Sequence, residues 1–378
     1  DLNGITAVNG WQNIVPDEFS DWVGQRDPNF DNYISLGDKK DKKAITIFDN
    51  YSQGVLTSRD AWCVNFSKKS LIDNISGMVS FYNQERQSYH KQLKNNAEAT
   101  VEDVIDNDVK SISWSRALKN DLKRNKDYRF SKNHLTSTLY RPFISSNFYF
   151  DRHFNEMVYQ MPSIFPLVDT DNKVICVVGK GEKIGFSCLI SNKVPNYHFM
   201  ASSQCFPLYL YEEIEEENGD TNNFQLSLTP SNESNDEENI VTDDNGKSIY
   251  RRKDAITNEG LAHFANYYDS QMNECDSITK EDLFYYIYGL LHSEDYRERY
   301  AENLTKQLPN IPRVRSYKDF IAFSKAGRKL ADLHVNYESV DMYQGVKFNS
   351  KLTNLKLADG QNWAKSNIDN DKFYVTKM

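Results

Sequence analysis

The sequence has 378 residues, 39% of them hydrophobic, which is long enough for a sizeable core and more than one structural unit. No run of about eighteen apolar residues occurs, and this excludes a segment that spans a membrane. The net charge of −9 argues against a nucleic-acid partner only until the acidic residues are located along the chain.

Two features favour a cytoplasmic location. The residues present begin at Asp1 without a basic-then-apolar stretch, so they contain no secretory signal. The five cysteines are widely spaced and form no C-x-x-C pair, which argues against a disulfide framework or a zinc site. We therefore expect a reducing compartment, and the missing initiator Met favours a piece excised from a longer polypeptide.

The first 66 residues look like an appendage to a fold that lies mostly elsewhere. They carry turn signals at short spacing, among them Asn9-Gly10 and Pro16-Asp17. One run, at 44–48, has the composition of a strand.

A long helix is predicted next, and it should run to about Leu93. Ser70 and Asp73 form a capping-box-like start. A polar loop is expected over 95–108. The apolar residues of the helix fall on one face: Leu71, Ile75, Met78, Val79 and Tyr82.

Residues 110–141 are strongly basic, with nine Lys or Arg against Asp121 and Asp127 alone. Helical character resumes over 112–122, and aromatic residues such as Trp114 and Tyr128 stand between the charges. Two interpretations remain open, an ordinary solvated helix face and a surface that follows a phosphate backbone.

Residues 136–256 predict a sheet, because short apolar runs alternate with Pro, Gly and Asn. An acidic stretch interrupts this region: residues 211–246 hold twelve Asp or Glu and no Lys or Arg. Without those twelve, the chain carries 45 basic and 42 acidic residues, so the acidity is local. We expect a solvated insertion there. The strand-like runs are 139–143, 148–150, 174–178, 186–190 and 206–211.

Helices return near the end of the chain. Thr279 and Ser316 each begin a cap pattern followed by an apolar stripe, and a shorter stripe lies between them over 296–304. The complete pattern predicts an α+β fold: a helical connector, then a mixed β-sheet core, then a helical bundle-like segment.

Catalytic motifs are absent. No P-loop, no paired histidines for a metal and no methyltransferase base-binding loop occur, so we predict no catalytic residue, no metal site and no cofactor in this segment. Gly179–Gly185 has the wrong glycine spacing for a dinucleotide loop and favours a turn. Asp169, Asp171 and Lys173 lie in a polar turn, which makes a nuclease group there the weaker reading.

Other clusters have the character of a recognition surface. Arg141 and Arg152 place two guanidinium groups among aromatic residues at strand ends, where Arg can bond guanine or stack on a ring. Polar side chains of 195–198 and 202–204 lie in a loop between predicted strands. The alternatives are an Arg141 paired with a carboxylate inside the fold and loops that are only structural.

Several motifs, taken in order, resemble the C-terminal specificity region of Type ISP restriction-modification enzymes. The similarity runs from roughly Trp11 to the end of the chain. The motifs are Thr57-Ser-Arg-Asp-Ala-Trp62, Tyr140-Arg-Pro-Phe143, Pro195-Asn-Tyr-His198, Gln204-Cys-Phe-Pro-Leu-Tyr-Leu-Tyr211, Ile278-Thr-Lys-Glu-Asp-Leu-Phe-Tyr-Tyr-Ile-Tyr-Gly-Leu-Leu-His-Ser293, Tyr296-Arg297, Leu308-Pro-Asn-Ile-Pro312 and Leu333-His334.

The resemblance implies a domain plan. Members of that family are single cytoplasmic polypeptides that join a nuclease, a helicase-like ATPase, an adenine methyltransferase and a target-recognition domain. By resemblance, residues 1–67 are the tail of the methyltransferase domain, 68–135 a helical connector with the basic segment, and 136–378 the recognition domain, with 211–248 as an acidic flexible insertion. S-adenosylmethionine, ATP and Mg are then expected for the full-length enzyme and none of them for this segment.

The favoured hypothesis is a DNA target-recognition module that positions an adenine-N6 methyltransferase and an ATP-driven nuclease at an asymmetric site. Its partners would be double-stranded DNA and the methyltransferase, helicase and nuclease domains of the same polypeptide. The alternative is a docking module without direct base readout, and whether the chain is itself an enzyme stays open. The residues predicted to contact DNA are Lys123, Arg124, Lys126, Arg129, Lys180 and Lys183 for phosphates and Arg141, Arg152, His198 and Gln204 for base edges.

Overall fold

The computed structural model describes residues 14–214, 240–242, 248–341, 366–369 and 372–375. The chain forms two units, residues 1–335 and 336–378. In the second unit, β14 (Ser366–Asp369) and β15 (Lys372–Val375) pair as an antiparallel hairpin. Every residue predicted to contact DNA belongs to the first unit.

The first unit begins with short elements and then a long helix. The helix α2 (Lys68–Asn95) starts at Ser67, whose hydroxyl accepts a hydrogen bond from the Ser70 N–H at 3.2 Å, so the predicted start at Ser70 is slightly late. The predicted strand at 44–48 is wrong, because this stretch makes only single bridges to β1 and to Ile256. The short elements are η2 (Pro28–Asn32), β1 (Ile34–Ser35), β2 (Ser52–Gln53), α1 (Asp60–Cys63) and β3 (Val64–Asn65).

Two small helices follow α2. One, α3 (Val101–Val104), lies inside the predicted loop, and a capping box between Thr100 and Asp103 begins it. The other, α4 (Arg116–Lys123), confirms the expected helix of the basic segment, although it starts later than predicted. The polar composition of 95–108 concealed α3, because a single turn of helix has no apolar stripe.

Two four-stranded sheets form the centre of the unit. In the first, β4 (Leu135–Arg141) and β5 (Ile144–Tyr149) make a hairpin flanked by β8 (Val194–Pro195) and β3, in the order β3-β5-β4-β8. The second, in the order β2-β9-β6-β7, contains β6 (Val174–Val177), β7 (Cys188–Ser191) and β9 (Gln204–Pro207). These strands confirm the predicted β region.

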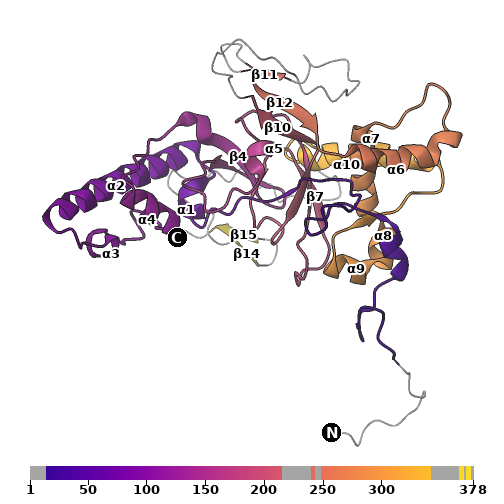
Figure 1. Cartoon of the computed structure of the whole chain (residues 1–378), viewed down its shortest axis with the longest axis horizontal. Helices are drawn as coiled ribbons and strands as arrows, with labels where there is room; N and C mark the ends of the chain where they lie inside the picture. Colours follow the sequence, from indigo (N-terminus) through magenta and orange to yellow (C-terminus); the bar gives the residue numbers. More distant parts are fainter. Residues whose placement is uncertain (1–13, 215–239, 243–247, 342–365, 370–371, 376–378) are drawn as a thin grey trace, which may run out of the picture. The chain divides into compact units, whose positions relative to one another are not determined.

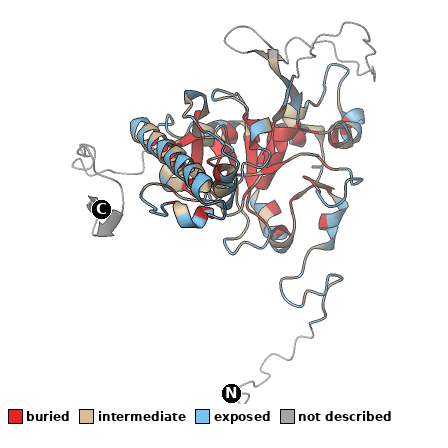
Figure 2. Ribbon diagram, turned by 60° about the vertical axis from the view of Figure 1, so that its left-hand side comes forward, coloured by how far each residue is buried: buried red, intermediate tan, exposed pale blue. Residues whose placement is uncertain are grey.

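The strand β6 separates two hydrophobic cores. Ile175 and Val177 pack into the core that holds α7 and α10, whereas Val174 and Cys176 pack into the core that holds α2 and β4. Both faces of the strand are therefore buried, and Figure 2 shows the continuous buried region through the sheets. This explains the unbroken apolar run at 174–178, since alternation is needed only where one face meets water.

The acidic stretch lies mostly outside the described residues, and so does the prediction that it is a solvated insertion. At its ends, β10 (Tyr209–Glu213), β11 (Ile240–Thr242) and β12 (Ser248–Asp254) form an antiparallel sheet in the order β10-β12-β11. The apolar run at 206–211 is thus divided between β9 and β10.

The last part of the unit is helical and confirms the predicted caps. The hydroxyl of Thr279 accepts a hydrogen bond from the Asp282 N–H at 3.0 Å, and Ser316 accepts one from the Asp319 N–H at 3.1 Å. Figure 1 shows α7 and α10 on the opposite side of the sheets from α2 and α4. The helices of this part are α6 (Asn258–Tyr268), α7 (Lys280–Leu291), α8 (Glu294–Arg299), α9 (Ala301–Lys306) and α10 (Tyr317–Val335), with the turn η5 (Asp269–Gln271) and the two-residue strand β13 (Asn310–Ile311) between them. The short helix α5 (Met161–Ile164) lies earlier, between β5 and β6.

Helices α7 and α10 cross at two glycines. A methyl group at Gly327 would collide with the carbonyl oxygen of Tyr285, and one at Gly289 would lie 2.7 Å from the carbonyl oxygen of Phe323. The two backbones therefore touch, which fixes the middle of α10 against α7. The chain contains both helices and strands, and they are largely grouped in different parts of the chain. The predicted α+β class is therefore confirmed. None of the helices in the described ranges is long and apolar enough to cross a membrane.

Candidate nucleic-acid interface

The helix α4 presents a basic face. Its residues Leu118 and Leu122 are buried, which turns Arg116, Lys119 and Lys123 to the other side. These three cations line a polar hollow beside Trp114. Spacings of three and four residues place them on one helical face, as a surface that follows a phosphate backbone requires.

Some cations of the basic segment are neutralised by their own neighbours. The Lys126 Nζ lies 2.8 Å from Asp121 Oδ1, and the Arg129 Nε lies 3.5 Å from Asp127 Oδ2. Lys123 and Arg124 are exposed, and among the described residues no ion pair involves either of them. These two side chains are therefore the better placed to meet phosphates.

Arg141 is held at the end of β4. Its Nη1 donates to the Tyr140 carbonyl oxygen at 2.6 Å, and its guanidinium group lies 4.1 Å from the centre of the Tyr140 ring. Across the described part of the chain, no carboxylate forms an ion pair with Arg141, which removes the predicted alternative of a pair inside the fold. The Tyr140 hydroxyl is held in turn by Asp60, to which it donates at 3.0 Å.

Asn196 joins Arg141 to the predicted loop at 195–198. Its side-chain oxygen lies 3.4 Å from the Arg141 Nη1 and accepts the His198 N–H at 2.9 Å. Asn196 is 3% exposed, whereas Arg141 is half-buried and His198 is exposed. Asn196 therefore joins Arg141, at the end of β4, to the backbone of His198, in the turn after β8.

A hollow of about 600 Å³ lies beside this junction, and we call it the histidine cleft. Phe143 belongs to the turn between β4 and β5, where it has a φ of +56° and is 44% exposed. A positive φ is costly for an aromatic residue, so the turn holds this ring over the cleft at some expense of stability. Lys183 precedes Ile184 in the β6–β7 loop and so stands next to the cleft. The cleft is lined by Pro142, Phe143, Ile184, Ser187, Cys188, Leu189, His198, Phe199, Met200, Ala201, His292 and His334.

His292 and His334, which sequence reasoning did not select, occupy the inner part of the cleft. Their rings lie 5.5 Å apart, and the His334 Nδ1 is 2.6 Å from the hydroxyl of Tyr288. Burial lowers the pKa of His292 to about 4 and also lowers the pKa of His334, so both rings are neutral near pH 7. Neither histidine has a neighbouring histidine in the sequence. The sequence signal that could have identified them is that each lies at the end of an apolar helical stripe.

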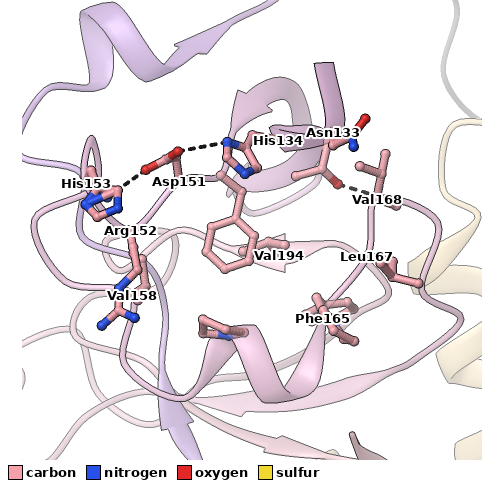
Figure 3. A pocket seen from close by; sticks show the side chains of 14 residues that line it. Asn133, His134, Asp151, Arg152, His153, Val158, Phe165, Leu167, Val168 and Val194 are labelled. Carbon is pink, nitrogen blue, oxygen red and sulfur yellow. Dashed lines mark hydrogen bonds and ion pairs between the residues drawn. The ribbon is translucent and has the colours of Figure 1, made fainter. Parts of the chain in front are cut away.

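Arg152 lies at a different pocket, of about 330 Å³ (Figure 3). On the polar edge of this pocket, Asp151 lies between His134 and His153. Its Oδ2 is 2.8 Å from His134 Nδ1, and its Oδ1 accepts the His153 N–H at 2.7 Å. Burial by itself would raise the pKa of Asp151, but these hydrogen bonds outweigh it and lower the pKa. Arg152 therefore lines another pocket than the histidine cleft near Arg141.

Lys180 and Gln204 also lie away from the histidine cleft. Lys180 lines a polar hollow with Asp38, Lys39 and Lys40. Gln204 is half-buried at the start of β9, where its backbone pairs with Gln53 and Val177. Of the ten predicted residues, His198 lines the histidine cleft, and Arg141 and Lys183 each precede a residue that lines it, Pro142 and Ile184. Four others, Lys123, Arg124, Lys126 and Arg129, lie at the end of α4 or in the segment just after it.

The loop at 179–185 is a turn between two antiparallel strands, as predicted. Gly181 and Gly185 have φ values of +75° and +73°, and β7 follows them, where a dinucleotide loop would lead into a helix. Within the described ranges, no group of three or more His, Cys, Asp or Glu side chains is arranged to hold a metal ion.

Comparison with known proteins identifies a family. The family model described as "Type ISP C-terminal specificity domain" matches residues 46–378. No curated protein sequence matches the chain significantly.

Three solved structures are similar over most of the chain. A nuclease-deletion mutant of the Type ISP restriction-modification enzyme LlaGI, in complex with a DNA substrate mimic, is 32% identical over 89% of this chain with a TM-score of 0.64. The DrdV–DNA complex is 30% identical over 90% with a TM-score of 0.66, and the ATP-dependent Type ISP enzyme LlaBIII bound to DNA is 30% identical over 88% with a TM-score of 0.65. The matched region makes up 22%, 29% and 18% of those chains, respectively.

Proposed function

This chain belongs to the Type ISP C-terminal specificity domain family, and from that membership we propose that it recognises a DNA target sequence on behalf of a larger restriction-modification enzyme. The similarity to LlaGI in complex with a DNA substrate mimic, at 32% identity over 89% of this chain, is the observation that carries the proposal. The chain spans less than a third of each solved relative, so the activities of the rest of such an enzyme are proposed with it.

Two surfaces of the chain make two kinds of contact with DNA. Exposed cations at the end of α4, with Lys123 and Arg124 foremost, position the phosphates without regard to sequence. Side chains around the histidine cleft, with Arg141 and His198 foremost, meet base edges. The other candidates, Lys126, Arg129, Arg152, Lys180, Lys183 and Gln204, are proposed as further contacts.

The cofactors and partner domains complete the proposal. S-adenosylmethionine, ATP and Mg act in the methyltransferase and helicase parts of the full-length enzyme. The partners of the chain are double-stranded DNA and the methyltransferase, helicase and nuclease domains of its own polypeptide.

Docking against neighbouring domains is a second candidate function. Trp22 is 59% exposed and Val23 84% exposed, and both lie in the stretch that resembles the methyltransferase tail. Large apolar side chains left in water are typical of a surface that another domain covers. A chain that only docks would carry these side chains without any base readout.

Binding to a panel of duplexes that differ at single base pairs tests the main proposal. In the full polypeptide that carries this chain, Arg141→Ala should cost about 1–3 kcal/mol of discrimination at one position of the target and leave the other positions unchanged. Arg141→Lys, which keeps the charge and loses the planar fork, should show most of the same loss. A wild-type polypeptide that binds every duplex equally would favour docking.

A further inference from the structure

The inner wall of the histidine cleft contains a buried hydrogen-bond chain. Tyr288, on α7, is 0% exposed, and its hydroxyl lies 2.6 Å from His334 Nδ1. The same hydroxyl oxygen accepts the Ile190 N–H at 3.2 Å. Strand β7, helix α7 and helix α10 therefore meet at one hydroxyl group.

The direction of these hydrogen bonds determines which nitrogen of His334 carries the proton. Burial raises the pKa of Tyr288, so its hydroxyl keeps a proton that needs an acceptor. Among the described residues the acceptor within reach is His334 Nδ1, because the Ile190 nitrogen is a donor. A neutral imidazole that accepts at Nδ1 carries its proton at Nε2.

The ring of His334 is also fixed in position. Phe143 meets it edge to face with ring centres 5.4 Å apart, and the ring of Tyr288 lies 6.0 Å from it on another side. Since Nδ1 is turned to Tyr288, the Nε2–H is the polar group that His334 offers to the cleft.

One polar atom of a residue that lines the cleft is buried without a partner among the described residues. The Nε2 atom of His292 is buried and has no hydrogen-bond partner in the described part of the structure. Buried polar atoms without partners are rare in proteins and mark places where a ligand or a water completes the bonding. The apolar side chains of Phe143, Ile184 and Met200 line the same cleft.

We propose that the histidine cleft reads the edge of one base pair of the DNA target, with His334 as a specificity-determining residue that donates its Nε2–H to an acceptor on that edge. The proposal rests on the proposed function of DNA target recognition. The acceptors that fit are N7 or O6 of guanine, N7 of adenine and O4 of thymine. The amino group of cytosine offers a donor at this place and is rejected. Tyr288 acts as a positioning residue, because it sets which nitrogen of His334 carries the proton.

Two variants of the full polypeptide test the proposal on the panel of single-base-pair duplexes. His334→Ala should reduce discrimination at one target position by about 10-fold and leave the other positions at the wild-type ratio. Tyr288→Phe should relax the same position by a smaller factor, since Nδ1 and Nε2 then share the proton. The double variant should be no less specific than His334→Ala, because both changes remove one contact.

Tyr286→Phe is the matched control. Tyr286 is also fully buried on α7, and its hydroxyl donates to the Pro312 carbonyl oxygen at 2.6 Å, away from the cleft. Its loss should lower stability without changing the ratio of affinities at any position.

The outcomes separate this inference from the proposed function. If His334→Ala and Tyr288→Phe keep the wild-type ratios at all positions, the role of His334 is disproved while target recognition stands. If the wild-type polypeptide shows no preference among duplexes, target recognition itself fails. If His334→Ala does not fold, Tyr288→Phe decides, because it keeps the His334 ring and removes the hydroxyl that sets its tautomer.

Discussion

The basic segment, residues 110–132, and the histidine cleft hold their polar groups in different ways. In the basic segment most cations are exposed, and some have partners close in sequence, as in the pair of Lys126 with Asp121. In the cleft the polar groups come from distant parts of the chain and are tied by buried hydrogen bonds, as at Tyr288 and His334. A phosphate tolerates a mobile point charge, whereas a base edge needs a donor in a fixed place, so each arrangement suits one kind of contact.

The largest expected effect comes from separating the helices that build the cleft. Gly327→Ala should lower the free energy of unfolding by about 3 kcal/mol, because its methyl group would press on the Tyr285 backbone. Gly77→Ala is the opposite control: Gly77 is exposed in α2 with nothing near its Cβ position, so the change should raise stability by about 0.5–1 kcal/mol. Urea unfolding measures the free energy of unfolding of both variants. If Gly327→Ala raised it as Gly77→Ala is expected to do, α7 and α10 would not touch at Gly327.

A second, smaller effect is expected from acid. Because burial holds the pKa of His292 at about 4, below the ordinary value of 6.5, the unfolded chain takes up a proton at higher pH than the folded chain. Above about pH 6.5, His292 therefore does not reduce the free energy of unfolding. Between pH 6.5 and pH 4 the free energy of unfolding falls by roughly 2 kcal/mol, after allowance for the partial exposure of His292.

The basic segment should respond to acid later. The pKa of Asp121 is lowered: burial would raise it, but hydrogen bonds from Lys126 and Tyr128 prevail, so its contribution is lost only below its ordinary pKa of 3.8. Urea midpoints at pH 7 and pH 4.5 measure the difference. His292→Gln should remove much of the fall between these two values, and an unchanged fall would assign it to other groups.

The smallest effect is expected from single cations of the basic segment. Lys123→Ala and Arg124→Ala should each reduce the slope of log affinity against log salt by about 1, with less than about 1 kcal/mol lost near physiological salt. Discrimination among duplexes should stay at the wild-type ratio. A change in specificity from either variant would contradict the division between the two surfaces.

Local elements were predictable because their signals are short-range. The cap at Thr279, the apolar stripe of α2 and the buried strand β6 all depend on residues within one or two turns. Two local predictions failed: α3 is too short to have an apolar stripe, and the residues at 44–48 make isolated bridges, to Ser35 and to Ile256, in place of a strand. The family could also be identified from the sequence, since its motifs keep their order along the chain.

The grouping of the candidate residues was beyond local reasoning. The amino-acid sequence supplied the α+β class, most elements and the cationic character of 110–132, all of which follow from residue type and periodicity. Tertiary packing placed Arg141 beside His198, moved Arg152 to another pocket and brought His292 and His334 into the cleft. The physical reason is that these arrangements depend on one buried amide, Asn196, and on the backbone contact of α7 with α10, which join residues far apart in the chain.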